Sequence, residues 1–159
     1  MKITILAVGK IKEKYFADAV MEYKKRLSRY CKLEIIEVAD EKTPENTSPA
    51  EEEQILKKEG QRIIKAIKQD ALIIALAIEG KMFSSEQFAA QIEKDMIQGL
   101  SHLIFIIGGS LGLSKEVISR SDRMLSFSAM TFPHQMMRVI LLEQIYRAMR
   151  IIKKEPYHK

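Results

Sequence analysis

The sequence predicts a three-layer α/β fold, in which a mainly parallel sheet carries helices on both of its faces. Short apolar segments rich in β-branched residues alternate along the chain with longer segments of helical periodicity, and this alternation is typical of parallel sheets. The clearest apolar segment, residues 103–107, runs directly into Gly108, Gly109 and Gly112. A doubly buried strand followed by glycines indicates a ligand-binding loop at the carboxyl edge of a sheet; an ordinary strand-to-helix turn is the alternative.

The first elements follow from the periodicity of the apolar residues. Residues 2–8 are apolar and end at Gly9, which predicts a first strand. Residues 15–29 repeat apolar side chains at helical spacing with lysines opposite, which predicts an amphipathic helix. Residues 32–39 alternate and then become apolar, so we expect a second strand there.

The middle of the chain is predicted to contain a loop, a helix and a third strand. Residues 41–49 are rich in Pro, Ser and Asn and are expected to form a loop. The helix is expected to begin at Ser48 or Pro49 and to continue through Ile67. Glutamates in its first turn interact favourably with the positive end of the helix dipole. Residues 71–77 predict the third strand.

The second half of the chain repeats this alternation. A helix is predicted from residue 84 or 85 to residue 98, and a short helix from Ser114 follows the strand at 103–107. Residues 124–127 predict a fifth strand, and residues 133–152 a last helix. No repeat, low-complexity run or linker interrupts the pattern, so residues 1–159 are expected to form a single domain.

The composition narrows the class of protein. A single cysteine, Cys31, excludes an internal disulfide, and His102, His134 and His158 lack the spacing of metal ligands. No apolar run approaches transmembrane length, and the N-terminus lacks a signal-peptide pattern. We therefore expect a cytoplasmic protein with neither a metal ion nor a membrane partner.

The charge favours a polyanionic partner without establishing one. The formal net charge is +5, with eight Lys or Arg residues in 10–32 and six in 138–159. Such charge is compatible with nucleic-acid binding. Solvated helix faces also carry runs of charge, so this alternative stays open.

The last predicted helix combines a broad apolar surface with two polar residues. Its apolar side chains cover about half of a helical wheel, so either a partner subunit or the rest of its own chain must cover it. His134 and Arg138 stand four residues apart inside this apolar arc. A buried charge must be paired or used, so the two indicate either a polar substrate pocket, which we favour, or a structural ion pair.

The predicted loops at the carboxyl edge do not fit a nucleotide motif. The first strand lacks the G-x-G-x-x-G fingerprint, and no G-x-x-x-x-G-K-[ST] phosphate loop is present. The loops at 76–78, 108–109 and 127–132 instead offer backbone groups and apolar side chains. Such a lining suits an adenine-bearing ligand with little negative charge.

Four motifs make the chain resemble the RlmH family of SPOUT-class methyltransferases. They are Leu76-Ala77-Ile78-Glu79-Gly80-Lys81, Ile107-Gly108-Gly109-Ser110-Leu111-Gly112-Leu113, Met130-Thr131-Phe132-Pro133-His134-Gln135 after Leu125-Ser126-Phe127-Ser128, and the tail from Arg138 to Tyr157-His158. The resemblance covers essentially the whole chain. It implies methylation of N3 of a pseudouridine in 23S ribosomal RNA on the assembled ribosome, S-adenosylmethionine as the donor, a homodimer, and a deep trefoil knot in the C-terminal half.

The resemblance also implies which residues form the site. The cofactor is expected against eight positions: Leu76, Gly108, Phe127, Ser128, Ala129, Met130, Thr131 and Phe132. The candidate catalytic residues are His134, Arg138, Tyr157 and His158. Many relatives carry an acidic residue in the glycine loop where this chain has Ser110 and Leu111, so the group that faces the sulfonium is open.

The expected chemistry gives each candidate a role and a structural alternative. The N3–H group needs a base or a polarising donor, which His134 could supply, and Arg138 could stabilise the imide anion. Tyr157 and His158 could cover the site or stack on a base. The alternatives are a helix cap for His134, a phosphate clamp for Arg138 and a disordered end for the tail. Two other functions compete, a non-catalytic RNA- or ribosome-binding protein and a nicotinamide oxidoreductase.

Overall fold

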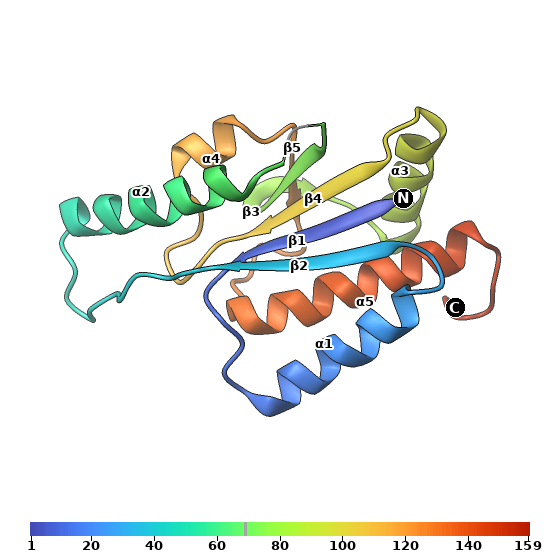
Figure 1. Ribbon diagram of the computed structural model, residues 1–159, viewed down its shortest axis with the longest axis horizontal. Coiled ribbons are helices and arrows are strands. Elements are labelled where there is room, and N and C mark those ends of the chain that lie inside the picture. Colours follow the sequence, from blue (N-terminus) through green and yellow to red (C-terminus); the bar gives the residue numbers. More distant parts are fainter. Residues whose placement is uncertain (69) are drawn as a thin grey trace.

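A computed structural model of the chain, which describes residues 1–68 and 70–159, contains one sheet of five parallel strands in the order β2-β1-β4-β3-β5 (Figure 1). The strands are β1 (Lys2–Val8), β2 (Lys32–Val38), β3 (Leu72–Met82), β4 (His102–Ile107) and β5 (Arg123–Ser126). The helices are α1 (Lys14–Leu27), α2 (Pro49–Ala66), α3 (Ser85–Ile97), α4 (Lys115–Ser119) and α5 (His134–Ile152). The predicted α/β class and parallel sheet are confirmed.

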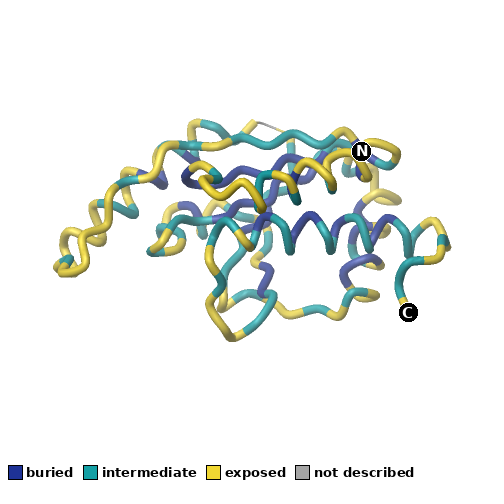
Figure 2. The backbone as a smooth tube through the Cα atoms, turned by 90° about the horizontal axis from the view of Figure 1, so that it is seen from below, coloured by how far each residue is buried: buried dark blue, intermediate teal, exposed yellow. Residues whose placement is uncertain are grey.

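The helices form a layer on each side of the sheet, with α1 and α5 on one face and α2 and α4 on the other (Figure 1). Alternate side chains of the central strands separate into two cores. Ile5 and Phe105 belong to the core shared with α1, α3 and α5, whereas Leu6 and Ile106 belong to the core shared with α2 and α4. In Figure 2 the buried residues accordingly follow the central strands and recur along the helices that cover them.

The predicted capping residues start their helices. Ser48 accepts a hydrogen bond from the Glu51 N–H at 3.3 Å, and the Glu51 carboxylate accepts one from the Ser48 N–H at 2.7 Å. Ser84 and Gln87 form the same reciprocal arrangement at α3. Both helices therefore begin with a capping box, which satisfies N–H groups that would otherwise lack partners.

Strand β3 is longer than predicted because it bends around β5. Leu125 of β5 pairs with Leu76 and also with Lys81, although both belong to β3. A Cβ atom at Gly80 would lie 2.7 Å from backbone atoms of Leu125 and Met124, so this part of β3 lies directly against the β5 backbone. The predicted strand at 71–77 therefore ends too early. The trefoil knot implied by the resemblance stays a prediction.

Helix α5 is covered largely by its own chain. Leu141, Leu142 and Ile145 are fully buried, and they pack in the core that also contains residues of α1 and α3. Of the two explanations for the broad apolar arc, coverage by the same chain therefore accounts for its centre. A dimer seam at Ile145 is excluded by this packing, because the side chain has no exposed surface.

In the part of the chain that the structure describes, no helix is long and apolar enough to cross a membrane.

Candidate functional site

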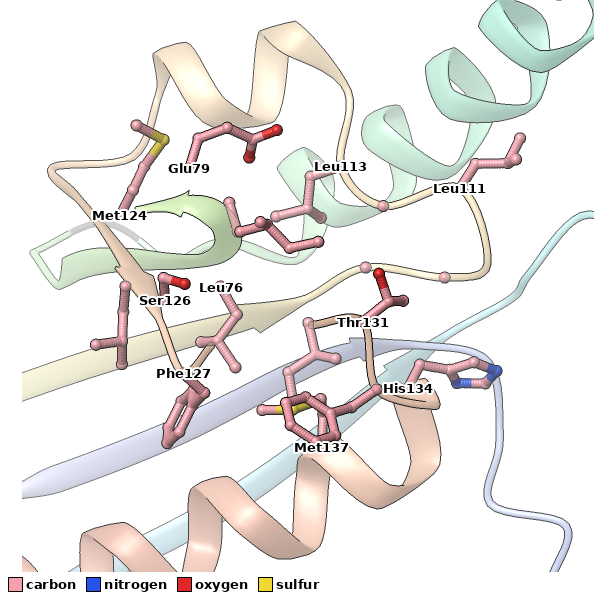
Figure 3. Close-up of a pocket in the computed structure, with 18 of the residues that line it drawn as sticks. Leu76, Glu79, Leu111, Leu113, Met124, Ser126, Phe127, Thr131, His134 and Met137 are labelled. Carbon is pink, nitrogen blue, oxygen red and sulfur yellow. The ribbon is translucent and has the colours of Figure 1, made fainter. Parts of the chain in front are cut away.

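A cavity of about 1070 Å³ opens where the loops after β3, β4 and β5 meet the start of α5 (Figure 3). This is the carboxyl edge of the parallel sheet, where ligands bind in open α/β folds. The volume is sufficient for a ligand of nucleoside size or larger. The site predicted at the glycine loop therefore coincides with a preformed cavity.

Apolar side chains and backbone groups form most of the cavity wall. Leu76, Phe127 and Met137 contribute apolar surface from three different elements. The described lining contains the titratable residues Glu79, Lys115 and His134, and Figure 3 places Glu79 and His134 at opposite ends of the cavity. A cavity with such a wall suits a ligand that contains a flat apolar ring with polar edges.

Seven of the eight residues expected to contact the cofactor line this cavity. They are Leu76, Gly108, Phe127, Ser128, Met130, Thr131 and Phe132. Ala129 is not part of the lining, although its neighbours are. The loop that carries them is held by its own serines, because Ser126 Oγ donates to the Ser128 carbonyl at 3.1 Å and the Met130 N–H donates to Ser128 Oγ at 3.0 Å.

The glycine loop is constrained by its own backbone. A Cβ atom at Gly108 would lie 2.4 Å from the Gly112 carbonyl oxygen, and the Gly112 N–H donates to the Gly109 carbonyl at 3.1 Å. Gly112 also has a φ of +83°, which favours glycine. The lack of a side chain at Gly108 therefore allows the loop to close on itself.

Glu59 is a buried acid behind this loop that the sequence did not single out. It lies in α2 with 3% of its surface exposed, and its Oε1 accepts a hydrogen bond from the Glu41 N–H at 3.0 Å. Its Oε2 has no partner among the described residues, and a Cβ atom at Gly109 would lie 3.1 Å from it. Burial, followed by the nearby Asp40 charge, raises the pKa of Glu59.

His134 begins α5 at the edge of the cavity. Its imidazole points away from Thr131 and Phe127 (Figure 3), toward Gly9, where a Cβ atom would lie 3.7 Å from its Cε1. Burial lowers the pKa of His134, and the Arg138 charge lowers it further. The ring is therefore held in its neutral form, and it lies at the cavity rim.

Arg138 lies outside the cavity in a structural ion pair. Its side chain is 1% exposed, and its Nη1 binds the Glu37 carboxylate at 2.6 Å. Its Nη2 donates to the carbonyl oxygens of Val8 at 3.3 Å and Gly9 at 2.5 Å. The preferred interpretation of Arg138 as a residue of a substrate pocket is therefore wrong for this structure, because all of these contacts tie α5 to the ends of β1 and β2.

Tyr157 and His158 lie at the opposite end of α5. Tyr157 donates a hydrogen bond to Glu143 at 3.1 Å and carries the Arg147 guanidinium over its ring, and His158 contacts Glu86 at 2.8 Å. Burial, followed by the Glu143 charge, raises the pKa of Tyr157 to about 12. The Tyr157 hydroxyl meets α5 at Glu143, nine residues beyond His134 or about 14 Å at about 1.5 Å per residue, and neither Tyr157 nor His158 belongs to the described lining of the cavity.

Comparison with known proteins assigns the chain to a family. The family model described as "Predicted SPOUT methyltransferase" matches residues 1–158. The chain belongs to the SPOUT methyltransferase family. Membership of this family implies S-adenosylmethionine as the methyl donor, and it removes the nicotinamide oxidoreductase from consideration.

Individual relatives support this membership over the full length. "Ribosomal RNA large subunit methyltransferase H" of Bifidobacterium adolescentis is 64% identical over 159 residues, which is 100% of both chains. A relative from Methanococcus maripaludis, which bears this name as a provisional assignment, is 62% identical over the same length. The resemblance to the RlmH family is thereby confirmed.

A solved structure provides an independent comparison of the SPOUT fold. A methylase family protein from Haemophilus influenzae has a TM-score of 0.57 and 12% sequence identity, and the match covers 99% of this chain and 70% of that chain. This likeness concerns the fold alone.

Proposed function

We propose that residues 1–159 act as one SPOUT-type methyltransferase domain that methylates ribosomal RNA of the large subunit. The supporting observation is the cavity, formed by the three loops that also carry the family motifs. Two full-length relatives bear the name of a large-subunit ribosomal RNA methyltransferase. Within this activity, we assign the target as N3 of a pseudouridine in 23S ribosomal RNA on the assembled ribosome.

The residues of the cavity fit the donor that the family implies. Leu76, Phe127 and Phe132 would supply apolar surface for its adenine ring, and Gly108 and Thr131 also belong to the lining that would hold it. When bound, S-adenosylmethionine supplies an electrophilic methyl group on a sulfonium centre. Glu79 is the acidic residue of the described lining and is placed to offset positive charge there.

The chain must also orient the target base and receive its N3 proton. His134 is neutral because its pKa is lowered, so it can accept a proton if its ring turns toward the cavity. Tyr157, with a pKa of about 12, is protonated near neutral pH and suits a hydrogen-bond donor. Arg138 does not contact the substrate in this arrangement, and its ion pair with Glu37 positions the start of α5.

A homodimer would bring the tail of one subunit to the cavity of the other. Tyr157 and His158 belong to the proposed site by family motif, yet they pack against α5 and α3 outside the described lining of the cavity of their own chain. In a two-fold dimer, the tail of one subunit can reach the cavity of the other. We therefore assign these two residues to the site of the partner subunit.

The decisive experiment combines the purified protein with ribosomes from a strain that lacks this methyltransferase. Transfer of labelled methyl from S-adenosylmethionine to a pseudouridine, located by mass mapping of 23S RNA, is the expected result. Calorimetric titration with S-adenosylmethionine distinguishes the methyltransferase from a non-catalytic RNA-binding protein, because the latter has no need of this cofactor. Methyl transfer to a different nucleotide would overturn the target, and absence of both donor binding and transfer would overturn the function.

A further inference from the structure

The segment between β1 and α1 carries an exposed group of cations with an aromatic ring. Lys10, Lys12 and Lys14 are exposed, and none forms an ion pair within the described residues. Tyr15 is 65% exposed, and its ring packs against Phe16 at a centroid distance of 4.6 Å. We refer to residues 10–15 as the lysine segment.

The lysine segment lies beside the proposed donor cavity. The Lys12 N–H donates to Gln135 Oε1 at 2.9 Å, and Gln135 is adjacent in sequence to His134, which lines the cavity. Gly9, which precedes the segment, lies beside His134, because a Cβ atom at Gly9 would be 3.7 Å from His134 Cε1. The cations therefore stand next to the cavity mouth, whereas the tail lies at the far end of α5.

Local stability does not explain this composition. Lys14 stands in the first turn of α1, where a cation opposes the helix dipole, and the N-cap Glu13 makes no side-chain capping hydrogen bond. In α2 and α3, by contrast, acidic residues occupy the first turn behind a capping box. Apart from the contact between Tyr15 and Phe16, neither the exposed Tyr15 ring nor the three unpaired lysines adds a stabilising side-chain contact with the described residues of the chain.

We propose that the lysine segment binds the RNA next to the target nucleotide, with its lysines on phosphates and Tyr15 stacked on an unpaired base. This inference rests on the function proposed above and assigns its substrate contact. RNA matches both parts of the surface, because lysines bind phosphates as flexible point charges and sequence-specific RNA recognition stacks splayed bases on aromatic rings.

The test compares two triple variants that lose the same charge. The first replaces Lys10, Lys12 and Lys14 with alanine; the control replaces Lys57, Lys65 and Lys94, which are exposed on α2 and α3. Binding to unmethylated ribosomes is measured over a range of salt. Each lost phosphate contact reduces the slope of log binding constant against log salt concentration by about 0.7–0.9. The first variant should therefore reduce this slope by about two, and the control variant by far less.

Tyr15 is tested separately. Tyr15→Ala should weaken ribosome binding by about 5- to 150-fold, the equivalent of about 1–3 kcal/mol for one stacked base, and Tyr15→Phe should retain most of the affinity. Donor affinity measured by calorimetry should be unchanged in every variant. KM for ribosomes should rise in the variants with less change in kcat.

Two outcomes would overturn the inference. Equal salt slopes for the two triple variants would show that the position of the lysines is unimportant. A loss of the dimer in Tyr15→Ala, seen by sedimentation, would assign the surface to contact between chains. Failure of the wild-type protein to methylate RNA would instead contradict the proposed function, so the two failures are distinguishable.

Discussion

Arg138 and Glu59 are buried charged residues at the carboxyl edge of the sheet, and their surroundings differ. Arg138 is paired with Glu37 and bound by two carbonyl oxygens, so its charge is compensated. Glu59 receives one hydrogen bond, and its second oxygen has no partner among the described residues. An ionised carboxylate is costly in such a place. Glu59 therefore reduces stability when it is charged, in contrast to Arg138.

We expect Glu59→Gln to stabilise the protein at neutral pH and to have little effect in acid. The folded state raises the pKa of Glu59 above its usual 4.5, so wild-type stability falls as pH rises from about 4.5 through the folded-state pKa. The glutamine keeps an acceptor for the Glu41 N–H and has no charge. Each 1 kcal/mol gained corresponds to about 2–4 °C in Tm for a chain of this size. Thermal unfolding of both proteins at pH 4 and pH 7 tests this, and an equal difference at the two values would contradict it.

At the scale of elements, the bend of β3 around β5 positions two of the three loops of the cavity. The segment between Leu76 and Lys81 passes against the β5 backbone. Leu76 to Glu79 and Leu125 to Ser128 all line the cavity, so the crossing fixes adjoining parts of its wall. A change at the crossing point should therefore affect both folding and donor binding.

Gly80→Ala is expected to be strongly destabilising and to weaken donor binding. Its Cβ would lie 2.7 Å from backbone atoms of β5, which cannot move as a flexible side chain can, and overpacking costs about 1–3 kcal/mol or more. Gly99→Ala is the matched control, because nothing lies within 4 Å of its Cβ and it incurs mainly the cost of its positive φ, about 1–2 kcal/mol. Chemical denaturation and calorimetry measure the two effects. Equal stability of the two variants with intact donor binding would show that the crossing is not tightly packed.

At the scale of the whole molecule, α5 separates the two parts of the proposed site. Its first turn borders the cavity, and Glu143 and Arg147, farther along the helix, hold Tyr157. One chain therefore presents the donor cavity and the tail at separate places along α5. Two copies in an antiparallel arrangement would bring each tail to the other cavity.

We expect a mass of twice 18.3 kDa by sedimentation and complementation between two inactive chains. Deleting residues 157–159 should lower methyl transfer while leaving donor affinity unchanged. Leu76→Trp should block the cavity and leave the tail intact. When the two chains are mixed, half of the dimers carry one complete site, so about a quarter of wild-type activity should return. No recovery in mixed dimers would contradict the shared site, and full activity of the truncated chain would show that the tail has no role.

Most of the local structure and the location of the cavity could be predicted from short segments. Ser48 and Ser84 indicated the helix starts that the structure has, and the glycines after residues 103–107 indicated the loop that borders the cavity. The reason is that caps, turns and apolar periodicity act within a few residues of the chain. The same logic missed Glu59, because a single glutamate on a charged helix gives no sign that it will be buried.

The sequence by itself therefore determined the elements, their class and the family of the protein. Only the tertiary structure decided the contacts of Arg138, Gly80 and the tail. Arg138 and Glu37 are 101 residues apart, and Gly80 contacts a strand that forms more than forty positions later in the chain. Such contacts depend on which strands become neighbours and how one bends around another. No local pattern encodes that choice, because it results from packing the whole sheet.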